Sequence, residues 1–238
     1  MNATLVLATL RQRFTSPIRM LIVLLLGWMP MLPILMAPMV GFAALGDCYF
    51  IALAMAAGMI GQDLSSGTLQ LLLARPVTRA QYVFSRWGAV AAGTFLIAVL
   101  QTLCAALIMA LRGAPVPWDQ AALHLGNSAL LALGVAAVMA LLSSLAAGLG
   151  DLGLLFLTFI SAQVLEKIGM FKSWPWLVRG AEEAMRVLKP ELDLAPLFHG
   201  DPVSWFAVVS YLSTITLCLG LAVVVMNRRE LSYASSGS

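Results

Sequence analysis

Long apolar runs separated by short polar segments are the dominant pattern of this chain. Uncharged stretches cover residues 20–46, 48–62, 87–111, 120–150, 152–165 and 202–227. A helix needs about 20 apolar residues to cross a bilayer, because each residue adds about 1.5 Å to a path of about 30 Å. Four of the stretches meet that length, and the two shorter ones reach it with polar flanks or by tilting.

The pattern therefore predicts an all-α, polytopic integral membrane protein with a single transmembrane domain over residues 1–238. Six transmembrane helices are expected at about 18–38, 48–62, 82–111, 121–148, 152–168 and 203–226. Pro30, Pro33 and Pro38 fall in the outer half of the first span. Proline breaks or kinks a helix, so we expect irregular backbone there, packed in protein or facing a cavity.

A polar segment between the second and third spans predicts a short amphipathic helix at about 65–74. Leu69, Leu72 and Leu73 fall on one face of it, at spacings i, i+3 and i+4. Pro76 ends it by disfavouring helical geometry in the residue before. The next helix is expected to start at 78–81, where Thr-Arg-Ala-Gln has the spacing of a capping box.

Two further amphipathic segments are expected at the membrane surfaces. The first fifteen residues predict a helix on the inner face, with Arg11 and Arg13 among the lipid headgroups. Residues at about 172–189 place an apolar stripe opposite charged residues, with Glu182 and Arg186 paired at i, i+4. This outer segment predicts an interfacial or re-entrant helix.

Composition agrees with a membrane location: 61% of the residues are hydrophobic and only 11% are charged, against about 25% charged in soluble domains. A cytoplasmic N-terminus places eight of the 14 basic residues inside, namely Arg11, Arg13, Arg19, Arg75, Arg79, Arg86, Arg228 and Arg229. The short loops beside the spans favour both termini in the cytoplasm. The net charge of +3 does not indicate nucleic-acid binding, because its distribution follows this topology.

Sulfur-containing residues gather near the outer ends of the first two spans. They are Met29, Met31, Met36, Met39 and Cys48. Soft sulfur ligands can pass Cu(I), but methionine in a membrane chain is mainly a packing residue. We therefore predict no metal site. We also predict no catalytic site, because the two histidines lack partners at a spacing typical of one.

Polar side chains inside the spans are the candidates for lining a pathway, since an unsatisfied amide in lipid is costly. Gln101, Asn127 and Gln163 are these candidates. His124 lies about one turn from Asn127, and a hydrogen-bonded pair between helices is favoured over a substrate site. Asp151 is expected to cap the fifth helix.

The sequence at 67–79, G-T-L-Q-L-L-L-A-R-P-V-T-R, closely resembles the loop signature of ABC-2 type permeases, the membrane subunits of one class of ABC exporters. Asp63 supplies the acidic residue that commonly precedes this signature, while Gln62 stands where a glutamate is usual. Looser matches are R-R-E-L at 228–231 and P-E-L-D at 190–193. With six spans, the resemblance covers nearly the whole chain.

The resemblance implies a permease subunit that exports substrate by alternating access, driven by a separate ATPase. The implied ATPase-coupling residues are Asp63, Gly67, Thr68, Leu69, Leu72, Leu73, Arg75, Pro76 and Arg79. The chain contains no G-x-x-x-x-G-K-[ST] motif, so ATP and Mg²⁺ would bind the partner subunit, and no cofactor or enzymatic activity is expected here.

The implied complex has two copies of a P-loop ATPase and a second permease half, as a homodimer or heterodimer, in the bacterial plasma (inner) membrane. One alternative is a mechanical ABC membrane subunit that acts on a periplasmic partner or in copper-site maturation. In that case residues 174–189 would be the contact. A second alternative, an ion-coupled secondary transporter, would need ionisable groups at mid-membrane. The substrate remains open.

Overall fold

The computed structural model describes residues 3–69, 77–198 and 200–228, and this part of the chain forms helices and turns without any strand. The helices are α1 (Ala3–Thr15), α2 (Pro17–Trp28), α3 (Met31–Met36), the 3₁₀ helix η1 (Pro38–Leu45), α4 (Tyr49–Ala56), α5 (Gly61–Ser65), α7 (Arg79–Leu111), α8 (Trp118–Leu145), α9 (Gly150–Phe171), α10 (Pro175–Leu188), α11 (Ala195–Phe198) and α12 (Trp205–Arg228). The all-α prediction is confirmed for these residues.

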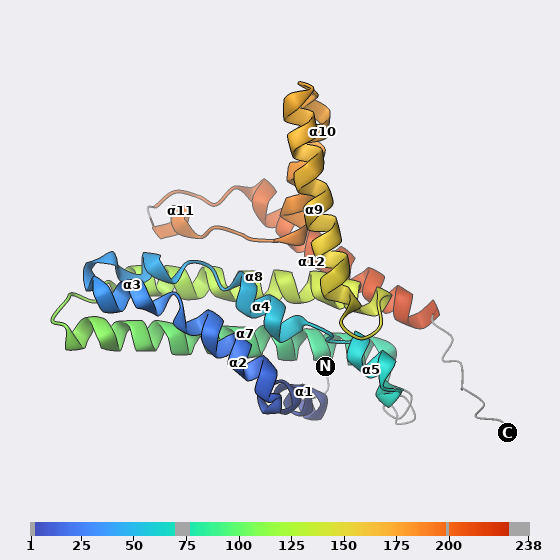
Figure 1. Cartoon of the computed structure of the whole chain (residues 1–238), viewed down its shortest axis with the longest axis horizontal. Coiled ribbons are helices and arrows are strands. Elements are labelled where there is room, and N and C mark those ends of the chain that lie inside the picture. The colour runs from blue at the N-terminus through green and yellow to red at the C-terminus, as the bar shows by residue number, and fades with distance from the viewer. Residues whose placement is uncertain (1–2, 70–76, 199, 229–238) are drawn as a thin grey trace.

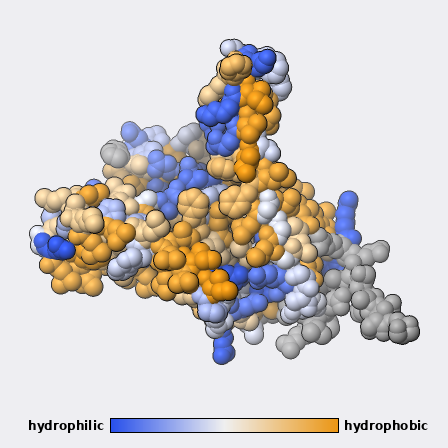
Figure 2. Space-filling model, in the orientation of Figure 1, coloured by the Kyte–Doolittle hydropathy of each residue, from blue (hydrophilic) through white to orange (hydrophobic). Residues whose placement is uncertain are grey.

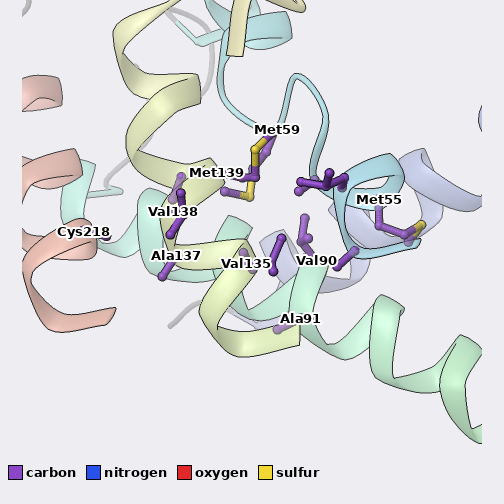
Figure 3. Close-up of a cluster of buried hydrophobic side chains, with 14 of the residues drawn as sticks. Met55, Met59, Val90, Ala91, Val135, Ala137, Val138, Met139 and Cys218 are labelled. Atoms are coloured by element: carbon purple, nitrogen blue, oxygen red, sulfur yellow. The ribbon is translucent and has the colours of Figure 1, made fainter. Parts of the chain in front are cut away.

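Helix α8 is at the centre of the fold and packs against α7, α12 and α4, while α1 packs against α7. Figure 1 shows α7 and α8 running side by side over almost the whole length of the bundle. The core where these two helices meet α4 combines methionines with small residues, such as Met55, Met139, Ala91 and Ala137 (Figure 3). Small side chains let membrane helices approach closely, and methionine fills the irregular gaps that remain.

The number of spans differs from the prediction of six. Among the described residues, α7, α8, α9 and α12 are long and apolar enough to cross a membrane. A fifth span results if Pro38–Leu45 and Tyr49–Ser65, which are bent by 42°, act together. The predicted first span is divided at Pro30 into α2 and α3. The 12 residues of α2 extend only about 18 Å. The prolines predicted this break correctly. Because the break leaves α2 too short to cross the membrane alone, six full-length spanning helices are not confirmed.

Helices α9 and α10 form an antiparallel pair, the α9–α10 hairpin, which projects away from the bundle (Figure 1). Figure 2 shows a hydrophilic surface along one side of this hairpin and a hydrophobic surface along the other. Most of α9 is exposed, including Phe156, Leu157 and Ile160. Helix α10 confirms a helix within the segment expected at about 172–189, and most charged residues of that segment are exposed. The expected pairing is wrong in one detail, because Arg186 pairs with Glu183 and not with Glu182.

Candidate functional site

The chain breaks its helical geometry directly after α4, just before the segment predicted to couple to an ATPase. Helix α4 ends at Ala56, Ala57 has extended geometry, and Gly58 has φ +63°, a left-handed conformation that favours glycine. The break leaves backbone groups without helical partners inside the protein. Buried backbone groups need hydrogen bonds, and in this break other elements supply them.

Arginines from α1 and α2 satisfy the carbonyl at the break. Arg13 donates from Nη1 to the Ala57 carbonyl oxygen at 2.6 Å, and Arg19 donates from Nη2 to the same oxygen at 3.4 Å. The expectation that Arg13 lies among lipid headgroups is therefore wrong, since only 2% of the residue is exposed. Burial, and then the positive charges of Arg19 and Arg86, lower the pKa of Arg13 to about 9, so it stays charged at neutral pH.

Side chains from α8 and α9 satisfy the amides at the same break. Asp151 accepts from the Gly58 amide at 2.7 Å, and the hydroxyl of Ser143 accepts from the amides of Ile60 and Gly61 at 2.9 Å each. Asp151 also accepts from the Leu152 amide, but α9 begins at Gly150 with Leu149 as its N-cap residue and has no side-chain cap. Asp151 therefore lies inside the first turn of α9 and does not cap it as predicted. Its contact with Gly58 was not predicted. These bonds attach the end of the α4 region to the turn between α8 and α9.

Asp63, the acidic residue of the signature, lies inside the protein and not on its surface. It is 3% exposed, forms an ion pair with Arg86, and accepts a hydrogen bond from the Tyr82 hydroxyl at 2.5 Å. Tyr82 and Arg86 are one turn apart on α7, which places both on the face towards α5. Arg86 also donates to Gln12 of α1 at 3.0 Å. A buried charge is stable only when paired and hydrogen-bonded, and Asp63 meets both conditions.

Arg79 connects the start of α7 to the end of α12. Its guanidinium donates to the carbonyl oxygens of Met226 and Asn227, the latter at 2.9 Å. A cation at a helix C-terminus satisfies free carbonyls and interacts favourably with the helix dipole. The capping box predicted at Thr78 and Gln81 is confirmed, because both reciprocal hydrogen bonds are present. Helix α7 therefore begins at a defined point, close to the end of α12.

The predicted coupling helix at about 65–74 is only partly within the described residues. Ser65, Ser66, Gly67 and Thr68 are exposed, and Thr68 and Leu69 are helical. Leu69 is 2% exposed and packs into the main hydrophobic core, so its side chain anchors this end of the segment to the rest of the protein. Leu72, Leu73, Arg75 and Pro76 lie outside the described residues, and their coupling role remains a prediction.

The three pathway candidates are distributed over different parts of the fold. Gln101 is buried and donates to the Gly27 carbonyl at 3.0 Å, which links α7 to α2. Asn127 accepts from the Leu194 amide at 3.0 Å, so it does not pair with His124 as expected. Gln163 is half-buried on α9. The structure does not bring these three residues together.

The sulfur-containing residues are dispersed in the same way. Met31 and Cys48 are buried in two different hydrophobic clusters, whereas Met29, Met36 and Met39 are exposed. The Cys48 thiol donates to the Ser128 carbonyl at 3.6 Å. In the described part of the chain, no group of three or more His, Cys, Asp or Glu side chains could hold a metal ion.

The side chains that sequence reasoning missed are the ones that secure the break, above all Arg13, Ser143 and Asp151. Arg86, expected only among the basic residues on the inner side of the membrane, is buried against Asp63. A signal was available for Arg86, since Tyr82 and Arg86 follow the capping box at helical spacing in a chain with few other charges. No local pattern marks the contacts of Ser143.

Comparison with known protein families matches residues 7–231 to the family described as ABC-2 family transporter protein. The match extends from within α1 to beyond the end of α12 and so includes every element of the site. No curated protein sequence matches the chain. The chain thus belongs to the ABC-2 transporter family and is a membrane subunit of an ABC transporter.

Proposed function

We propose that this chain is the permease half of an ATP-driven exporter and that the segment beginning at Ser65 docks on a separate ATPase. The observation that carries the proposal is the position of an exposed turn, 65–68, directly after a buried polar junction. That junction consists of the bonds around Gly58, Gly61 and Asp63. An exposed segment that is firmly attached to several spans is what a soluble motor needs in order to move them.

The contacts define how a displacement would pass into the membrane. Asp63 is bonded to α7 through Arg86 and Tyr82, and Arg86 is bonded to α1 through Gln12. The Gly148 amide donates to the Gly61 carbonyl at 2.7 Å, which attaches the α8–α9 turn. A push on the turn therefore moves α1, α7 and the α8–α9 turn together. Interfaces packed in this way switch between discrete arrangements and so transmit a rigid-body movement.

The proposed assembly has two such permease halves, identical or different, and two ATPase subunits that bind ATP and Mg²⁺. We place both termini in the cytoplasm of a bacterial inner membrane. In support, Arg86 of α7 contacts Gln12 of α1, and Arg79 contacts the end of α12, so α1 and the end of α12 lie at the same end of α7. Alternating access would then open the pathway at the opposite end.

A mechanical role is the second candidate, and the α9–α10 hairpin favours it. This hairpin projects from the bundle and has an exposed charged face that includes Glu183 and Arg186 (Figures 1 and 2). A subunit that moves an external partner would need such a projection. Deleting residues 174–189 should then abolish the partner interaction while ATPase docking persists.

The experiment that tests docking is purification of the chain from native membranes in mild detergent, followed by identification of co-purifying proteins. We expect a P-loop ATPase in one-to-one ratio. Thr68→Trp changes an exposed residue of the turn and should remove the ATPase from the preparation. Thr158→Trp, at an exposed site on α9, is the matched control and should retain it. Absence of any ATPase from the parent preparation would contradict the proposal.

A further inference from the structure

A cavity of about 600 Å³ lies at the end of α12 opposite its contact with Arg79. Its walls come from the start of α4, the α9–α10 hairpin, the connecting residues 189–193 and the first half of α12. Figure 1 shows the base of the hairpin beside the first turns of α12. Cavities of 300–1,000 Å³ accommodate drug-sized ligands, so this one is large enough for an organic molecule.

Aromatic rings form much of the apolar wall of the cavity. Tyr49, Phe159, Phe206 and Tyr211 line it, and they come from three different helices. The Tyr211 hydroxyl is already engaged, because it donates to the Leu130 carbonyl at 2.6 Å. Aromatic walls accept a hydrophobic body, and their electron-rich faces attract a cation in preference to an anion.

The charged groups at the cavity are unequal in number. Two cations, Arg186 and Lys189, line it together with three carboxylates, Glu183, Glu191 and Asp193. Arg186 is paired with Glu183 at 2.8 Å. Lys189 is shared between Glu191 at 3.0 Å and a fourth carboxylate, Asp47, at 2.6 Å. One ammonium group therefore faces two carboxylates.

Lys189 remains charged in this arrangement. Its partial burial opposes protonation, but hydrogen bonds to Asp47 and Glu191 outweigh that effect and raise the pKa of Lys189. Lys189 is therefore counted as a cation when the positive charges at the cavity are compared with the carboxylates. The excess of negative charge around Lys189 is therefore present at neutral pH.

Asp193 adds to this excess. Its Oδ1 accepts from Asn127 Nδ2 at 3.4 Å and from the Ala195 amide at 2.9 Å, both of which are neutral donors. Within 3–69, 77–198 and 200–228, no basic side chain is close enough to Asp193 to form an ion pair. Four carboxylates thus surround two cations, and a positively charged ligand would restore the balance.

We propose that this cavity binds an amphipathic organic cation, with its hydrophobic body against the aromatic walls and its charge beside Glu191 and Asp193. An anionic ligand would add to the existing excess of carboxylates. A bare metal ion does not suit a cavity whose walls are largely apolar and aromatic. The proposal names a cargo class for the proposed exporter and depends on that function only for the direction of transport.

The test compares two ions of the same shape and opposite charge, tetraphenylphosphonium and tetraphenylborate. Binding of each is measured to the purified full chain in nonionic detergent, without any ATPase. We expect saturable binding of the phosphonium, with the borate at least tenfold weaker. Equal binding of the two ions, or preference for the borate, would overturn the proposal.

Two variants locate the binding within the protein. Ser210→Trp fills the cavity from α12 and should reduce phosphonium binding at least tenfold, whereas Ser213→Trp, one turn away and outside the lining, should leave it unchanged. Asp193→Asn keeps the shape and should weaken binding about threefold to fivefold, in the upper part of the range for a partly exposed charge pair. Unchanged binding in both Ser210→Trp and Asp193→Asn would contradict the assignment.

Failure of this inference and failure of the proposed function give different results. Loss of ion selectivity in a preparation that still binds its ATPase contradicts only the ligand site. A chain that selects the phosphonium but never associates with an ATPase retains the site and contradicts the export mechanism.

Discussion

Arg86 on α7 forms a buried ion pair with Asp63 on α5, so the two ends of the loop that connects these helices are joined inside the protein. The side chains of the pair are only 8% and 5% exposed. The loop contains the sequence that resembles the coupling signature. Its two ends therefore cannot move apart independently, and a force on the loop acts on both helices.

Arg86→Ala should destabilise the protein by about 3–5 kcal/mol, because it leaves the Asp63 carboxylate buried without its cation. The measurement is thermal unfolding of the detergent-purified chain. Asp63→Asn should cost less, since an amide retains a hydrogen bond with Tyr82. An Arg86→Ala variant as stable as the parent would contradict the burial of this pair.

The ion pair between Asp63 and Arg86 should also affect the coupling of ATP hydrolysis to transport, beyond its effect on stability. Asp63→Asn is expected to retain the ATPase in the purified complex, because Ser65–Thr68 remain exposed for docking. We expect transport to fall more than ATP hydrolysis, since the ion pair that fixes the loop to α7 is lost and only a hydrogen bond to Tyr82 remains. Equal losses of both activities would point to simple misfolding.

Arg79→Ala should loosen the end of α12, because the carbonyls of Met226 and Asn227 lose their donor. The expected cost is about 1–2 kcal/mol, typical of a hydrogen bond to a charged group and a favourable helix-dipole contact. Hydrogen exchange over residues 220–228 should accelerate. Arg11→Ala, at an exposed position on α1, is the control and should leave that exchange unchanged.

Gly61→Ala should disrupt the junction more than its size implies. An added Cβ at Gly61 would lie 2.6 Å from the carbonyl oxygen of Gly148 and 2.7 Å from that of Ala146, both of them backbone atoms. The backbones would have to separate, at a cost of about 1–3 kcal/mol. Gly153→Ala meets nothing within 4 Å in α9 and should stabilise the helix by about 0.5–1 kcal/mol. Thermal unfolding of the two variants in parallel measures the difference.

The features that the sequence predicted correctly are those set by neighbouring residues. The capping box at Thr78, the break at Pro30 and the amphipathic α10 each depend on residues within a few positions of one another. Helical periodicity and proline chemistry are local, so a single sequence is enough to reveal them.

The candidate site was predicted only in part, because its bonds join distant positions. Arg13 contacts Ala57 across 44 residues, and Asp151 contacts Gly58 across 93. No local sequence pattern indicates which side chain will form hydrogen bonds with the free backbone groups at a helix break. Considered alone, Arg13 on a surface helix belongs among lipid headgroups; it is buried because a free carbonyl lies within its reach. The predicted number of spans differs from the observed number for a similar reason. The length of an apolar stretch predicts one continuous helix, whereas packing against other helices stabilises short, broken ones.

Gly134→Ala should displace residues 189–194, which connect the α9–α10 hairpin to α11 and border the proposed ligand cavity. A Cβ at Gly134 would lie 2.6 Å from the Pro190 carbonyl oxygen and 3.0 Å from its Cβ. The added methyl group and Pro190 cannot occupy the same space beside α8. Residues 189–194 should therefore move away from α8, which would weaken the contact between Lys189 and Asp47. We expect phosphonium affinity to fall about threefold or more, while ATPase co-purification persists because Asp63 lies at the other end of the bundle. Ala132→Gly, a neighbouring small-residue change that adds no atoms, is the control and should leave ligand binding unchanged. Normal phosphonium affinity in Gly134→Ala would show that the position of these residues does not determine the shape of the cavity.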